Sequence, residues 1–200
     1  MKRLLCSAAV LALAAVLAQP AAAQHTMPAD PHAAHAAHAA GGIVVKPAVT
    51  GVRADILRSI DAARDKLLAL AEATPADKFT WRPNDKVRTV GEVYAHVAGG
   101  NYFIPTFWGV KPPDGVDPRG FDKDAGDKAK TIANMKGSFE HIHRIIEGST
   151  DADLDKPAKL FDHEGTVREA LLILATHEHE HLGQSIAYAR SIGIVPPWSQ

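Results

Sequence analysis

The stretch Val167–Ile192, VREALLILATHEHEHLGQSIAYARSI, decides the fold that this sequence predicts. Its Ala170 and Leu174 fall on the same helix face as His177 and His181, because residues three or four apart lie one above the other. A long amphipathic helix is therefore predicted here, and this pair of histidines is expected to face the core.

Three upstream segments share this periodicity. Apolar residues at steps of three and four predict helices over residues 52–73, 90–108 and about 132–148. No stretch shows the convincing period-two alternation of a strand. The four segments therefore predict an all-α domain, a four-helix bundle over residues 49–200.

Polar residues mark the ends of the predicted helices. Thr89 with Glu92, and Thr166 with Glu169, fit capping boxes at the starts of the second and fourth helices. Residues 109–126, and the segment before Thr166, are rich in turn-forming residues, so both are expected to be long connections. A connection as long as the first is often functional, and we expect it to line the mouth of a site.

The N-terminal part of the chain has a different composition. A charged start, an apolar run from Leu4 to Leu17 and small residues after it predict a secretory signal peptide over residues 1–23. The run is too short for a membrane helix, which needs about 20 apolar residues. Residues 24–48 are rich in Ala, Pro and His and predict a disordered linker, whose histidines either bind metal loosely or are only solvated. The mature protein is expected in the periplasm or secreted, with no membrane attachment.

Composition also limits the chemistry of the mature chain. Cys6 is the only cysteine, and it lies at the start of the apolar run, where it cannot carry a lipid anchor. Without it the mature chain has no thiol, so a metal would have to bind to histidines and carboxylates. The chain has 22 basic and 23 acidic residues, a balance that does not suggest a nucleic-acid binder.

The most informative motif is His177-Glu178-His179-Glu180-His181. On a helix His177 and His181 can reach one ion, whereas His179 points to the other side. Two inward imidazoles need partners, and a shared cation satisfies both at once. The motif also matches His-Glu-x-x-His of the zinc proteases, with Glu178 as general base, but no third ligand follows it. Glu178 and Glu180 fit equally well as solvated flanking residues or as groups that support the ligands.

The third ligand is expected from upstream. His96 lies at the edge of the apolar stripe of the second helix, and His143 flanks the stripe of the third as a weaker candidate. His141 and His163 are interpreted as surface residues. Three histidines with an open position are typical of a catalytic zinc site, and nickel or iron also suits imidazole.

Four pieces of the sequence resemble the DinB/YfiT-like superfamily in their order and spacing. They are LAEATPADKFTWRP at residues 70–83, VGEVYAHV at 90–97, HEHEHLGQ at 177–184 and YARSIGIVPP at 188–197. The resemblance implies a four-helix bundle that holds a metal through one histidine of the second helix and two of the fourth. These positions fall on His96, His177 and His181.

The resemblance implies a range of functions rather than one reaction. Related proteins include transferases and isomerases that use a low-molecular-weight thiol, and such thiols are mainly cytoplasmic, unlike an exported chain. Two interpretations follow: a metal-dependent transferase or hydrolase acting on a small molecule, or a non-enzymatic exported metal-binding module. An enzyme should have a concave pocket beside the ion, and a carrier a filled or shallow site. Helical bundles of this kind also frequently form homodimers.

Overall fold

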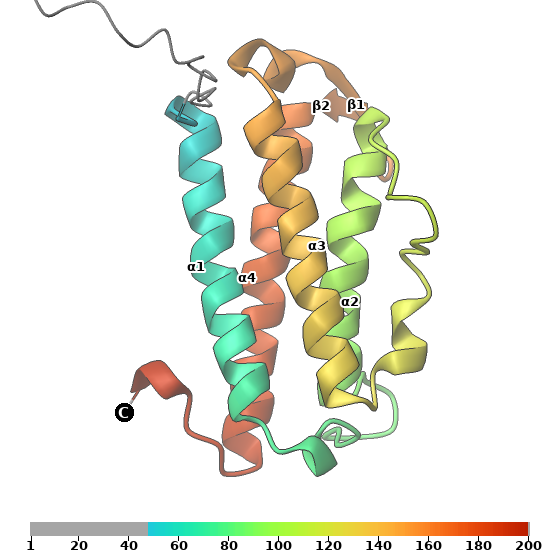
Figure 1. Ribbon diagram of the computed structural model, residues 1–200, viewed down its shortest axis with the longest axis vertical. Helices are drawn as coiled ribbons and strands as arrows, with labels where there is room; N and C mark the ends of the chain where they lie inside the picture. The colour runs from blue at the N-terminus through green and yellow to red at the C-terminus, as the bar shows by residue number, and fades with distance from the viewer. Residues whose placement is uncertain (1–47, 200) are drawn as a thin grey trace, which may run out of the picture. The chain divides into compact units, whose positions relative to one another are not determined.

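The computed structural model describes residues 48–199, and these form a bundle of four long helices (Figure 1). The helices are α1 (Gly51–Ala73), α2 (Val90–Phe103), α3 (Lys128–Gly148) and α4 (Val167–Ser191). The predicted all-α fold is confirmed, and the predicted helices match the observed ones to within a few residues, except that the second changes to a 3₁₀ turn after Phe103. The predictions for the signal peptide and most of the linker lie outside the described residues.

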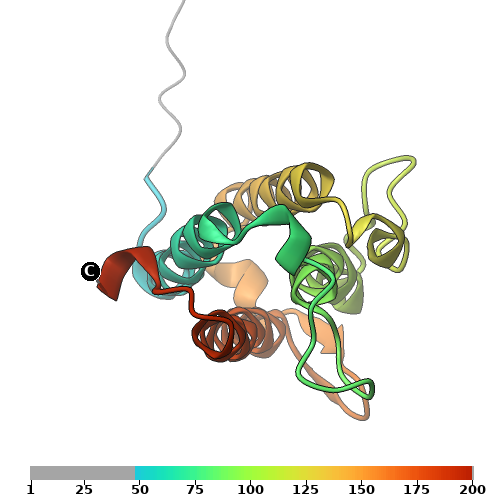
Figure 2. The ribbon, with the colours of Figure 1, turned by 90° about the horizontal axis from the view of Figure 1, so that it is seen from below.

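The helices are arranged so that α2 and α3 run parallel to each other, as do α1 and α4 (Figure 1). Each of α1 and α2 packs against both α3 and α4 (Figure 2). Because α2 and α3 point the same way, the chain between them must return along the whole length of the bundle. This requirement explains the long connection at residues 109–126, which includes a short 3₁₀ helix at Phe121–Asp124.

The return connection packs tightly against α2. A Cβ atom on Gly99 would lie 2.5 Å from the carbonyl oxygen of Pro118, so only glycine allows this approach. With the connection on one side and α3 and α4 on the others, α2 is buried almost all round, as its apolar sequence requires. His96 is one of its few residues that stay partly exposed.

The two predicted capping boxes have different outcomes. At the start of α2, the amide of Glu92 donates to the Thr89 side chain, and the amide of Thr89 donates to the carboxylate of Glu92. At the start of α4 only half of the motif forms, because Thr166 accepts from the amide of Glu169 while the Glu169 carboxylate contacts His163 instead.

Two predictions about the third helix and the segment after it are corrected. His141 was expected at the surface but is only 6% exposed. Its ring packs against Tyr102 with the ring centres 4.9 Å apart, because α2 covers a second, more polar side of α3. The segment before α4 contains a small antiparallel hairpin, β1 (Pro157–Lys159) with β2 (Glu164–Thr166), where no strand was predicted.

Within residues 48–199, none of the helices has the length and apolar character needed to cross a membrane.

Candidate metal centre

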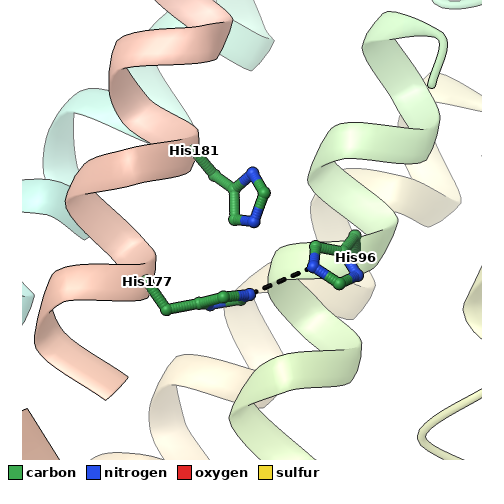
Figure 3. A group of neighbouring side chains, drawn as sticks. All are labelled: His96, His177 and His181. Carbon is green, nitrogen blue, oxygen red and sulfur yellow. Dashed lines mark hydrogen bonds between the residues drawn. The ribbon is translucent and has the colours of Figure 1, made fainter. Parts of the chain in front are cut away.

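Three histidines converge between the two facing helices α2 and α4 (Figure 3). His177 and His181 project from successive turns of α4 toward His96 on α2. The pair on α4 faces inward as predicted, with His181 only 7% exposed. The structure thus brings together the three residues that the sequence singled out.

The three side chains are close enough to share one ion. The Nε2 atoms of His96 and His177 lie 3.1 Å apart, and one nitrogen from each of the three rings falls within 4.8 Å of the others. Nitrogens bound to one tetrahedral zinc at 2.0–2.1 Å would lie about 3.3 Å apart. The spacing of this cluster therefore fits a single cation with little movement of the rings.

Gln184 fixes the tautomer of His181 that can bind a metal ion through Nε2. The Nδ1 atom of His181 lies 2.9 Å from Oε1 of Gln184, and Nε2 of Gln184 donates in turn to the hydroxyl of Tyr188. Since an amide oxygen only accepts, Nδ1 carries the proton, and Nε2 of His181 keeps its lone pair. Such a hydrogen bond on the far nitrogen is the usual way in which a protein orients a histidine ligand.

The position of His177 depends on a glycine across the helix interface. A Cβ atom on Gly100 would lie 2.5 Å from Cε1 of His177, closer than any normal contact. The absence of a side chain at this position lets the ring reach His96. Nδ1 of His177 is buried and has no hydrogen-bond partner among residues 48–199.

The surroundings keep two histidines of the cluster neutral. Burial, followed by the positive charge of Arg88 and by His181, lowers the pKa of His96 to about 4. Burial, followed by the neighbouring His181 and His96, lowers the pKa of His177 to about 3. Both rings are therefore neutral at pH 7, which is the state that binds metal ions.

A cavity of about 570 Å³ opens beside the cluster and is lined by His96 and His177. The 109–126 connection contributes Pro118 and Arg119 to its wall, so this connection borders the site as expected. A larger hollow of about 780 Å³ between α1 and α4 contains His179 but none of the three clustered histidines. Of these two hollows, the smaller one borders the histidine cluster, so it is the candidate substrate pocket.

The remaining acidic and histidine candidates lie elsewhere. His143 bonds to Asp61 between α3 and α1, and His179 bonds to Ser59 on the surface. Glu178 was read as a solvated flank or a supporting group, but its side chain is fully buried, and neither carboxylate oxygen has a hydrogen-bond partner in the described chain. Burial raises the pKa of Glu178, and the residue does not line the cavity, so the geometry does not support a protease-like base.

Sequence reasoning missed three contributors to the site. Arg88 and Phe161 line the cavity from segments outside the recognised motifs, and Gln184 was placed near the histidines without a role. The position of Gln184 three residues after His181 was a usable signal, since a residue at that spacing lies over the same helix face. Nothing in the local sequence of Arg88 or Phe161 indicates what they face.

The fold and the site define a class of protein: a four-helix bundle with a cluster of three histidines whose spacing fits a divalent cation. The chain belongs to the DinB superfamily, whose sequence model matches residues 59–185. Among solved structures it resembles a DinB-like protein from Bacillus cereus, with 18% identity, a TM-score of 0.59 and coverage of 71% of this chain and 93% of that one. This likeness shows the fold.

The chain is also similar to the DinB-like protein YjoA from Bacillus subtilis, with 20% identity and a TM-score of 0.47. That match covers 73% of this chain and 97% of the other. The comparison with curated proteins found no match.

Proposed function

We propose that this protein binds one divalent cation, zinc, nickel or iron, through His96, His177 and His181. We further propose that it acts as a metal-dependent transferase or hydrolase on a small molecule. The observation that carries the proposal is the cavity of about 570 Å³ that includes two of the three histidines in its wall. Pockets of this size commonly hold small-molecule ligands.

The residues around the cluster support this role in separate ways. Gln184 orients His181, and Gly100 leaves room for His177. Low pKa values leave lone pairs on His96 and His177 at neutral pH. A bound divalent cation would act there as a Lewis acid, polarising a substrate oxygen or lowering the pKa of a thiol or water.

The cavity favours an enzyme over a carrier. A protein that only holds metal is expected to surround its ion with ligands or to expose it on a shallow surface, whereas this cluster borders a concave cavity on one side. The pattern of residues 1–23 also leads us to propose that the protein works in the periplasm or outside the cell.

The first test is metal content and affinity. The purified full chain, the His177→Ala/His181→Ala double variant and a His179→Ala control would be analysed for bound metal and titrated against a competing chelator. His179 is a matched control because it lies on the same helix but outside the cluster. We expect one tightly bound ion in the parent and the control, and none in the double variant.

All three proteins keep the histidines of residues 24–48. Any loose metal binding by that segment is therefore the same in each and cancels when their metal contents are compared. A parent without a tight ion, or a double variant that keeps one, would overturn the proposal. The loaded parent would then be screened for thiol-transfer and hydrolytic reactions, and any activity should disappear in the double variant but not in His179→Ala.

A further inference from the structure

Two arginines at the cavity have no acidic partner. Arg88, just before α2, and Arg119, in the return connection, both line the cavity. In residues 48–199 no carboxylate lies within ion-pair distance of either guanidinium, although Arg53 and Arg168 pair with Asp151 and Asp155. Asp122 also lines the cavity but bonds to neither arginine. The cavity therefore carries an excess of positive charge.

Arg88 and Arg119 line the same cavity as His96 and His177, so the guanidiniums and a cation held by the cluster would border one space. The three imidazoles carry no negative charge that would offset either the guanidiniums or a bound cation. Two arginines and one aspartate leave the cavity wall with a net positive charge, which an anionic substrate can balance.

The rest of the cavity wall is apolar. Phe103 and Ile104 contribute from α2 and the turn after it, and Phe161 from the hairpin. The Phe161 side chain is 69% exposed, yet its ring packs edge-on against Phe107 with the ring centres 4.7 Å apart. An exposed aromatic ring held in place at a cavity mouth is suited to cover an apolar part of a ligand.

We propose that the cavity binds a small anion in which a carboxylate or phosphate group is attached to an apolar body. The guanidiniums of Arg88 and Arg119 hold the anionic group, and Phe103 and Phe161 contact the apolar part. Guanidinium suits this task because its planar set of N–H donors matches two oxygens of a carboxylate or phosphate. The inference rests on the proposed function in taking the cavity as the substrate pocket, and it adds the chemical class of the substrate.

The test compares ligands that differ mainly in charge. Phenylacetate, phenyl phosphate and the uncharged phenylacetamide would be titrated calorimetrically into the zinc-loaded full chain. We expect both anions to bind at least about tenfold more tightly than the amide, since two partly exposed ion pairs form. The ratio of the two anion affinities tells whether the site prefers carboxylate or phosphate.

Variants then test whether the preference for anions depends on the two arginines. The Arg88→Gln/Arg119→Gln double variant should lose about tenfold in affinity for the anions and keep its affinity for phenylacetamide. Asp122→Asn should bind the anions more tightly, because it removes the negative charge from the cavity wall. Arg190→Gln, an exposed arginine in the last turn of α4 that does not line the cavity, serves as the matched control.

The zinc content of every sample is measured as well, so that a failure of the proposed metal site can be told from a failure of the proposed anion site. A parent that holds no zinc contradicts the proposed function, and the dependence of anion binding on the arginines can still be measured on that protein. A parent that holds zinc but binds phenylacetamide as tightly as phenylacetate overturns the inference. The same conclusion follows if the anions do not bind, or if they bind equally well to the double-arginine variant.

Discussion

The histidine cluster and His163 on the β1–β2 hairpin are two histidine sites with opposite electrostatic surroundings. His96 and His177 lie among other imidazoles, and burial lowers their pKa values. The ring nitrogens of His163 lie 2.8 Å from Asp162 and 2.9 Å from Glu169, and these contacts raise its pKa. The same side chain is thus kept neutral in one region and favoured as a cation in the other.

This difference shows that the partners of a histidine, rather than its presence, indicate its role. An imidazole between two carboxylates has both nitrogens engaged as donors and cannot bind a metal ion. Among residues 48–199 no carboxylate is part of the cluster, and Glu178, next to His177 in sequence, is buried without a hydrogen-bond partner. The cluster therefore keeps free lone pairs, which the hairpin histidine does not.

The largest expected effect comes from Gly100→Ala. The new Cβ would meet Cε1 of His177 at 2.5 Å, and the clash can be relieved by turning the histidine ring away. The fold should survive, because the ring is the part that moves, but the cluster would lose the position of one ligand. We expect metal affinity to fall about 100-fold in a chelator-competition titration.

Gly183→Ala is the matched control for this change. Gly183 is also in a helix, but a Cβ there would meet no atom within 4 Å. Alanine favours a helix over glycine by up to about 1 kcal/mol, so this variant should be slightly more stable and bind metal like the parent. If Gly100→Ala binds metal as tightly as the parent, the observed position of the His177 ring is not required for metal binding, and the prediction is wrong.

Much of the fold, and the three cluster residues, followed from the sequence, for a clear physical reason. Periodicity reports which face of a helix is apolar, and His177 and His181 repeat at helical spacing on that face. The third residue, His96, was favoured by its place at the edge of the apolar stripe and then by the resemblance, whereas periodicity left His143 as a weaker candidate. Contacts within one helix or turn, such as the capping box of Thr89, were also predictable.

Other features depend on which elements pack together, and local sequence patterns do not indicate that packing. Glu178 is buried because α4 contacts both α1 and α2. The buried face of α4 is therefore wider than its apolar stripe suggests. His141 is covered by Tyr102 of another helix. The pairing of Glu169 with His163 follows from the hairpin, whose three-residue strands are too short to be recognised from the sequence. Arg88 also lines the cavity only because elements distant in the sequence pack around it.

A pH titration of stability without metal should sharpen the comparison on the cluster side. The unfolded pKa of histidine is about 6.5, whereas that of His177 in the fold is about 3. As the pH falls from 8 to 5, the unfolded chain gains a proton that the folded chain excludes, so stability is lost. His177→Asn lacks this proton site, and the parent should lose about 1–2 kcal/mol more than the variant over that range.

The measurement is denaturant unfolding in excess chelator at both pH values. Other titrating groups are shared by the two proteins and cancel in the difference. Equal losses in the parent and in His177→Asn would mean that the folded protein protonates this histidine as readily as the unfolded chain.

Gln184→Leu is expected to have a smaller effect on metal binding. The substitution keeps a similar volume but removes the acceptor that holds Nδ1 of His181. Without it the ring can adopt the other tautomer or rotate, and affinity should fall about tenfold. The control is Tyr188→Phe, which keeps Gln184 in place but removes the next hydrogen bond, and it should change affinity by less than about threefold. Equal effects of the two variants would show that Gln184 does not act through His181.

The smallest effect is expected at His163, and its sign is opposite to that at His177. Asp162 and Glu169 raise the pKa of His163, so its ion pairs stabilise the fold below the unfolded pKa and are lost as the pH rises through the folded pKa. His163→Asn should therefore lower the melting temperature at pH 5.5 by about 1 °C and leave it unchanged at pH 8.5, because exposed ion pairs contribute little. Addition of 1 M salt should shrink the difference at pH 5.5 by screening the charges. If His163→Asn instead becomes relatively more stable at low pH, as expected for His177→Asn, then the carboxylates do not hold this imidazole as a cation, and the contrast between the two regions fails.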